Sequence, residues 1–105
     1  MNNVALTGRL TRDPELRYIP TGTAVTKFTL AVDKNLSREK KEELESKGQP
    51  TADFINIVVW GKQAENVANF TSKGKLIAVQ GRIQSGSYEK DGQRVYTTDV
   101  VANNV

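Results

Sequence analysis

The stretch Ala52–Lys62 constrains the fold more than any other part of the chain, because its side chains alternate between two kinds with a period of two. That period is the repeat of a β-strand whose two faces lie in different surroundings. One face consists of β-branched residues that suit a packed sheet: Ile55, Ile57 and Val59. Phe54 and the only tryptophan, Trp60, fall on the other face. Because the aliphatic set can serve a core alone, the two rings are either buried on a second side or exposed as a stacking surface.

Length and composition predict one folded domain that covers residues 1–105. The chain is 37% hydrophobic and 26% charged, which fits a water-soluble globular protein with a single core. No apolar run approaches the length of a membrane span, and the residues after Met1 lack the basic and apolar blocks of a signal peptide.

Cysteine and histidine are both absent, which removes the usual transition-metal ligands and the usual acid–base groups near neutral pH. Asp33, Asp53 and Asp99 could be considered as metal ligands of a nuclease, but they share no motif spacing, and the chain has no phosphate-cradling glycine loop. We therefore expect no metal, no cofactor and no enzymatic activity. The net charge of +3 permits nucleic acid or an acidic surface as a partner.

Alternation predicts four further strands: Asn3–Leu10, Ala24–Val32, Leu76–Ile83 and Gln93–Ala102. Gly8 inside the first of these predicts a bulge, a tight bend or the close approach of another backbone. Glu15–Tyr18 lies between two proline-containing turns and is expected to form at most a short edge strand. Asp91-Gly92 indicates a hairpin turn. The residues expected to face the core from the second and fourth strands are Phe28, Leu30, Val32, Ile77, Val79 and Ile83.

Two segments break the period of two. Lys62–Gly74 carries a short apolar stripe at helical spacing, so it predicts a helix, with Phe70 docked onto the sheet and Lys73-Gly74 at its end. Arg38–Lys47 holds four basic and four acidic residues. We expect the surrounding segment, about residues 36–50, to be a solvated loop or a short helical excursion at a hairpin tip. A flexible basic flap over a ligand is the alternative, which the zero net charge weakens.

The predicted order is three strands, a helix and two strands. Five short antiparallel strands with one helix between the third and fourth is the order of the oligonucleotide/oligosaccharide-binding (OB) barrel. We therefore expect an all-β fold: a five-stranded OB-fold barrel with one short helix. That fold presents its middle strands to a ligand, and the third strand carries Phe54 and Trp60.

Single-stranded nucleic acid requires flat side chains on which unpaired bases stack, together with cations for the phosphates; stacking contributes about 1–3 kcal/mol per base. The candidate stacking residues are Phe54, Trp60 and Tyr88, and Tyr88 shares the strand parity of Arg82 if that strand continues. Basic residues of the same framework could neutralise phosphates, Lys27 among them, and those that we expect to do so are Lys34, Lys62, Lys73, Arg82, Arg94 and Arg9. The alternative is a protein-interaction module with the Phe54/Trp60 face buried in an interface.

The chain resembles the core domain of bacterial-type single-stranded DNA-binding proteins over nearly its whole length. The matching segments are Asn3–Leu10, Asp13–Tyr18, Phe28–Ala31, Val59–Glu65, Lys73-Gly74, Gln80–Ile83 and Tyr96–Val100. Individually they are short, but their order and spacing together make the match specific.

This resemblance implies an OB-fold barrel, usually a homotetramer, that wraps and protects single-stranded DNA without sequence preference in replication, recombination and repair. It also implies base stacking on Phe54, Trp60 and Tyr88, and basic groove residues at Lys62 and Lys73. It places the protein in the cytoplasm, in a bacterial nucleoid or a phage-infected cell. An RNA-binding or primosome-type relative on the same barrel is the nearest alternative.

The chain departs from the family's pattern in three places. The family's further stacking aromatic falls at or beside Leu36, so one stacking residue is missing or moved. Gln84–Ser87 is polar where some relatives are strongly basic, so we expect weaker binding there. Family members commonly continue into a flexible tail with an acidic, aromatic tip that recruits other proteins, whereas this chain stops at Val105. Recruitment of partners through such a tail is therefore not expected of residues 1–105.

Overall fold

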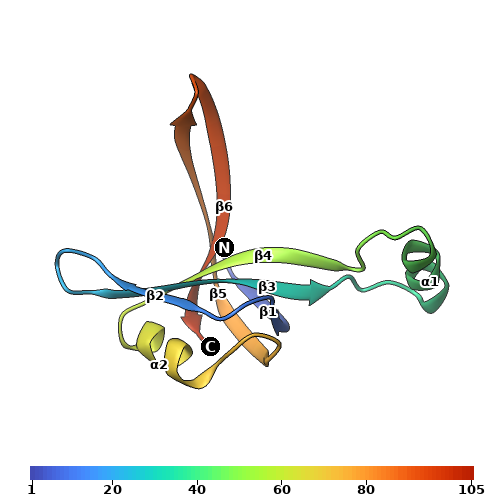
Figure 1. Cartoon of the computed structure of the whole chain (residues 1–105), viewed down its shortest axis with the longest axis horizontal. Coiled ribbons are helices and arrows are strands. Elements are labelled where there is room, and N and C mark those ends of the chain that lie inside the picture. Colours follow the sequence, from blue (N-terminus) through green and yellow to red (C-terminus); the bar gives the residue numbers. More distant parts are fainter.

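Six strands and two helices make up the fold in the computed structural model, which describes residues 1–105 (Figure 1). In chain order the elements are β1 (Val4–Leu10), β2 (Glu15–Tyr18), β3 (Ala24–Asp33), α1 (Arg38–Ser46), β4 (Ala52–Trp60), α2 (Lys62–Phe70), β5 (Leu76–Lys90) and β6 (Gln93–Asn104). Neither helix has the length and apolar character that crossing a lipid bilayer requires.

Five of the strands close into a ring. The sheet order is β1-β5-β6-β4-β3-β2, and β1 also pairs with β3, so β2 remains as a short edge strand on β3. The expected OB-type barrel, with a helix between β4 and β5, is confirmed. The expectation that all strands are antiparallel is wrong at one contact, because β4 and β6 pair in parallel. A closed ring with an odd number of strands cannot alternate direction throughout, so one parallel pair is required.

The barrel interior is filled by strand side chains and by two side chains of α2; of the predicted core residues Phe28, Leu30 and Val79 are buried, whereas Val32 and Ile77 are partly buried against the cluster. The buried cluster consists of Leu10, Ala24, Phe28, Leu30, Ile57, Val59, Ala64, Val67, Val79, Val100 and Ala102. Gly8 is confirmed as a close approach of two backbones, because a Cβ at this position would overlap the carbonyl oxygen of Ala31 on β3. This contact lies where β1 and β3 close the ring.

Helix α2 lies against the barrel through Ala64 and Val67, which are buried, and through the buried Thr26 hydroxyl, which donates to the Ala64 carbonyl at 2.7 Å. The prediction that Phe70 docks onto the sheet is wrong, since its side chain is 72% exposed. Phe70 follows Ala64 by six residues and therefore points about 240° around the helix from it. The predicted helix end at Lys73-Gly74 is also wrong: α2 ends at Phe70 with Thr71 as its C-cap, and Gly74 belongs to the turn before β5.

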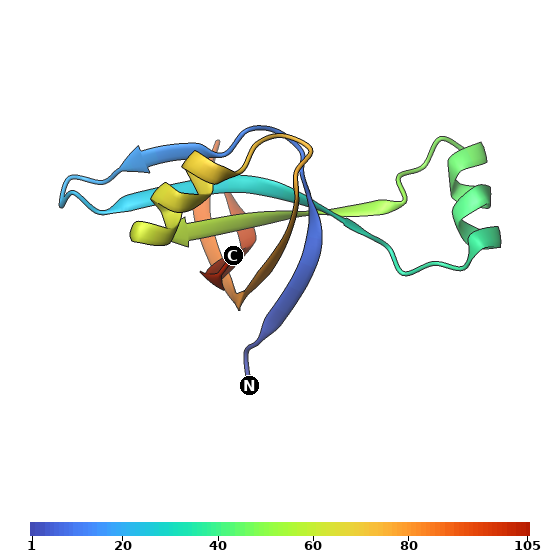
Figure 2. The same ribbon diagram turned by 90° about the horizontal axis from the view of Figure 1, so that it is seen from below.

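Strands β3 and β4 run past the barrel and carry α1 at their far end, apart from the rest of the protein (Figure 2). The predicted helical excursion is confirmed, so the fold has two helices rather than one. Ser37 caps α1 by accepting from the backbone N–H of Lys40. The helix buries no residue, and its ion pairs, such as Lys47 to Glu43 at 3.0 Å, lie within the helix and its C-cap.

The second projection is a hairpin arm formed by β5 and β6, which rises steeply from β3 and β4 (Figure 1). Its turn is the predicted Asp91-Gly92, where both residues have positive φ (52° and 77°). The prediction that Ile83 is a core residue is wrong, because its side chain is 47% exposed although it pairs with the buried Val100. The side chain of Asn2 instead exchanges two 2.8 Å hydrogen bonds with the Ile83 backbone.

Candidate nucleic-acid interface

The side chains of β3 and β4 on the face opposite the barrel core lie in register, although two of them, Val25 and Val58, are themselves buried. The pairs are Phe54 with Ala31, Asn56 with Thr29, Val58 with Lys27, and Trp60 with Val25. Phe54 is 60% exposed and Trp60 is 47% exposed, so the predicted orientation of both rings away from the core is confirmed. The two rings stand six residues apart on β4, about 20 Å along an extended strand.

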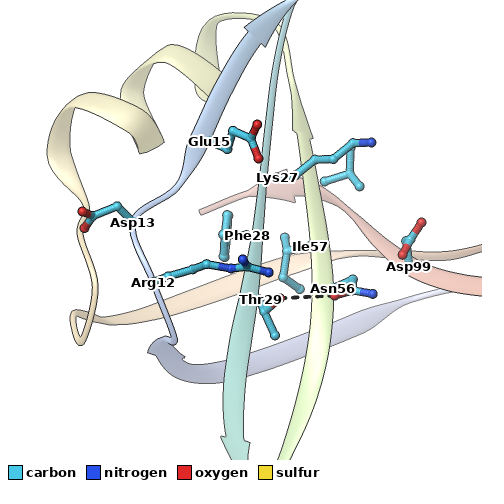
Figure 3. A pocket seen from close by; sticks show the side chains of 10 residues that line it. Arg12, Asp13, Glu15, Lys27, Phe28, Thr29, Asn56, Ile57 and Asp99 are labelled. Carbon is cyan, nitrogen blue, oxygen red and sulfur yellow. Dashed lines mark hydrogen bonds between the residues drawn. The ribbon is translucent and has the colours of Figure 1, made fainter.

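A cavity of about 340 Å³ opens on this surface between the positions of the two rings. Lys27, Thr29 and Asn56 contribute polar side chains to its wall, and Arg12 extends toward them from the β1–β2 connection (Figure 3). The Thr29 hydroxyl donates to Oδ1 of Asn56 at 3.3 Å, which leaves the Asn56 amide free to donate to a ligand. Asn56, which lies between Phe54 and Trp60 on β4, is therefore part of the cavity wall.

Two of the basic residues predicted to bind phosphate share this surface through strand register. Arg9 pairs with Ala31, which pairs with Phe54, so the three side chains form one row. Arg82 pairs with Val101 on β6, and Val101 pairs with Val58 beside Lys27, which forms a second row. The guanidinium of Arg9 is already engaged, since its Nη1 donates to the Gly74 carbonyl at 3.0 Å.

Lys62 and Lys73 lie outside the sheet. Lys62 is the first residue of α2, two positions after Trp60, and is exposed. Lys73 lies in the loop between α2 and β5, where its backbone N–H donates to Oδ1 of Asp13 at 2.8 Å. Asp13 also lines the cavity, so the loop that carries Lys73 is bound to a residue of the cavity wall, whereas Lys73 itself does not line the cavity.

Lys34 and Arg94 are not brought together with the exposed rings. The ammonium of Lys34 lies 2.7 Å from the Asp53 carboxylate, at the neck of the β3–β4 hairpin. Arg94 pairs with Glu89, so it stands on the opposite face of the arm from Tyr88, which pairs with Val95. Sequence parity could not reveal the first case, because an ion pair between separate strands leaves no local pattern.

Tyr88 is exposed on the same face of β5 as Arg82, as its parity predicted, because the strand continues to Lys90. The β5–β6 arm, however, to which Tyr88 belongs, runs away from β3 and β4 (Figure 1). A DNA strand that used all three aromatic residues of one chain would therefore have to leave the β3–β4 surface and follow the arm.

None of the residues that line the cavity was among the selected site residues, although Lys27 was a candidate for phosphate binding; Arg12 and Asn56 are additions from the structure. The outward parity of Lys27 and Asn56 was visible in the sequence, whereas nothing local placed Arg12 over β3. The acidic residues Glu15 and Asp99 line the cavity together with Asp13, and the Glu15 carboxylate accepts from Nε of Arg17 at 2.7 Å. No three acidic side chains come together in an arrangement that could hold a metal ion.

A closed five-stranded barrel with exposed aromatic and basic side chains on its middle strands has the architecture of an oligonucleotide-binding domain. Comparison with known proteins is more specific, since residues 1–105 match the single-strand binding protein family. The chain belongs to this family, as its motifs indicated. The family is one of binding proteins, which agrees with the expectation of a protein without enzymatic activity.

Bacterial proteins that are similar to this chain are named single-stranded DNA-binding proteins. The chain is 60% identical to a single-stranded DNA-binding protein of Clostridium tetani, a match that covers the whole chain and 68% of the relative. It is 60% identical to single-stranded DNA-binding protein 2 of Clostridium acetobutylicum, over 100% of the chain and 74% of the relative. For the single-stranded DNA-binding protein of Halalkalibacterium halodurans the identity is 55%, over 100% of the chain and 59% of the relative.

Proposed function

We propose that this chain binds and protects single-stranded DNA without sequence preference, with bases stacked on Phe54 and Trp60. The observation that carries the proposal is the outward surface of β3 and β4, where two exposed rings flank a cavity that contains Lys27. Every base offers a flat face to such rings, which accounts for tolerance of sequence. Duplex DNA binds poorly because its bases are already stacked and paired.

Phosphate neutralisation is assigned first to Lys27, which lines the cavity, and to the selected basic residues that share or border this surface: Arg9, Lys62, Lys73 and Arg82. Lys34 joins them only by leaving Asp53. An exposed ion pair of this kind is worth about 0–1 kcal/mol, so a phosphate can compete for the lysine. Tyr88 and Arg94 act where the DNA follows the arm, Tyr88 by stacking and Arg94 by meeting a phosphate on the other face.

We also propose a homotetramer. β1 pairs with β5 over Val4–Arg9 but with β3 only at Arg9 and Leu10, so its other edge is unpaired over most of its length. The outward residues Ala5 and Thr7 are small and exposed, which suits close approach of a second copy. An open strand edge of this kind favours pairing with another chain. Light scattering on the eluting protein should give four times the chain mass of 11.6 kDa.

In the cell, the proposed role is to coat single-stranded DNA during replication, recombination and repair, in the cytoplasm and at the bacterial nucleoid. The bacterial relatives named single-stranded DNA-binding proteins support this assignment.

Trp60 provides the test, because it is the only indole in the chain. A thymidine oligomer titrated at two salt concentrations should quench its fluorescence. Binding should be weaker at the higher salt, because the release of counterions from the DNA on binding is then less favourable. Absence of quenching at saturating oligomer and low salt would exclude the stacking role of Trp60. An affinity that does not change with salt concentration would favour the alternative of an apolar protein interface. Tighter binding to a uridine oligomer than to a thymidine oligomer would favour an RNA-binding role.

A further inference from the structure

The loop between α2 and β5, residues 71–75, is fastened to the end of β1 and the β1–β2 connection. Four hydrogen bonds hold it there. Oδ1 of Asp13 accepts from the Lys73 backbone N–H at 2.8 Å, the Gly74 N–H donates to the Leu10 carbonyl at 2.8 Å, and Nη1 of Arg9 donates to the Gly74 carbonyl at 3.0 Å. The Leu10 N–H donates to the Lys75 carbonyl at 3.2 Å. Two of these bonds involve the backbone of Gly74. Lys73 itself makes only one of them, in which its backbone N–H donates to Asp13.

The direction of the Asp13 side chain separates it from the other residues of the cavity. Although Asp13 lines the cavity, its carboxylate points away from Arg12 and Lys27 toward the loop that follows α2 (Figure 3). An acidic side chain in a DNA-binding groove would ordinarily repel phosphates. Here one of its oxygens is instead used to fix the backbone of a lysine.

We propose that Asp13 is a positioning residue for single-stranded DNA binding, which holds Lys73 at the edge of the groove through its backbone N–H. This inference rests on the proposed function, and in particular on a phosphate contact by Lys73. It predicts the opposite of what charge alone predicts. Removal of an acidic side chain from a DNA-binding surface should tighten binding, whereas loss of the Asp13 acceptor should weaken it.

The experiment measures the affinity for a thymidine oligomer against salt concentration for Asp13→Ala, Asp13→Asn, Lys73→Ala and the double variant Asp13→Ala/Lys73→Ala. A phosphate contact on a single strand contributes about 0.7 to the slope of log affinity against log salt. Lys73→Ala should lower the steepness by about that amount, and Asp13→Ala should reproduce most of the loss. The double variant should be no weaker than Lys73→Ala. Asp13→Asn should bind at least as tightly as the wild type, because its amide oxygen still accepts while the charge is gone.

Asp33→Ala is the matched control. Asp33 is an exposed aspartate on the outward face of β3, and its carboxylate makes no hydrogen bond or ion pair in the structure. Its removal should leave affinity unchanged or raise it. Hydrogen exchange of the Lys73 amide gives a second readout, and it should accelerate in Asp13→Ala but not in Asp33→Ala.

The outcomes separate the inference from the proposed function. If Lys73→Ala lowers the slope but Asp13→Ala binds as tightly as the wild type, the positioning role is overturned while the function stands. If Lys73→Ala leaves the slope unchanged although the oligomer still quenches Trp60, the phosphate contact of Lys73 and the inference both fall. If the oligomer does not quench Trp60, stacking on this residue falls as well. Thermal denaturation of each variant excludes unfolding as the cause of weaker binding.

Discussion

Replacement of Phe54 by leucine separates stacking from packing. The ring is 60% exposed, so about two-fifths of a side chain of roughly 200 Å² is covered, or about 80 Å². At about 25 cal/mol per Å² its full removal would cost about 2 kcal/mol of folding free energy, and leucine keeps most of the contact with Ala31, so we expect a loss below about 1 kcal/mol. Stacking is worth about 1–3 kcal/mol per base, which corresponds to a loss of about 5- to 150-fold in affinity.

Leu30→Val is the matched core variant, because Leu30 is fully buried beside Ala31 on the same strand. Loss of one buried methylene should cost about 1 kcal/mol and lower the melting temperature by about 4–8 °C, with affinity unchanged below the transition. Trp60 fluorescence reports affinity in both variants, since neither replaces the indole, and thermal denaturation reports stability. If Phe54→Leu lowers the melting temperature as much as Leu30→Val and leaves affinity intact, Phe54 is a packing residue and the stacking argument is refuted.

Three further predictions concern the framework. Gly8→Ala should lower the free energy of unfolding by about 1–3 kcal/mol, measured by denaturant titration, because the new methyl group meets the Ala31 carbonyl. The charge of Glu65 raises the pKa of Tyr18 above its ordinary value of 10.0, so stability should fall as pH rises past that value; Tyr18→Phe should flatten this alkaline loss in pH-dependent melting curves. Ser37→Ala should reduce the helical circular dichroism signal of α1 by loss of its N-cap and leave the melting temperature of the barrel unchanged, because α1 buries no residue.

Local periodicity was sufficient for the strands and for the side on which the two rings lie. Ile57 and Val59 are buried while Phe54 and Trp60 are exposed, as the period of two in β4 required; Val58 departs from the alternation because it is buried on the side of the rings. The hairpin turn at Asp91 was equally local, because a positive φ at both turn residues suits the aspartate-glycine pair.

Periodicity failed where an element extends past the structure that would cover it. Ile83 keeps the parity of a core residue and pairs with the buried Val100, but β5 continues from there into the arm and the side chain is about half exposed. Phe70 failed for a different reason, since the short helix α2 buries only a narrow stripe, Ala64 and Val67, and Phe70 lies off that stripe. Sequence gives the faces of an element but not the length over which a partner covers it.

The basic half of the interface depends on closure of the ring, which no single strand encodes. Arg82 reaches the row of Lys27 only because β6 lies between β5 and β4 and pairs in parallel with β4. The same closure brings Arg9 into line with Phe54, since β1 meets β3 for just two residues at the end of the barrel. Strand parity was therefore enough to orient the aromatic residues. To decide which basic residues lie beside them, one must also know which two strands of the ring pair in parallel, here β4 and β6. Arg94 illustrates this limit. It lies on a predicted strand, but it is on the opposite face of the arm from Tyr88 and near the tip of the arm, away from the groove.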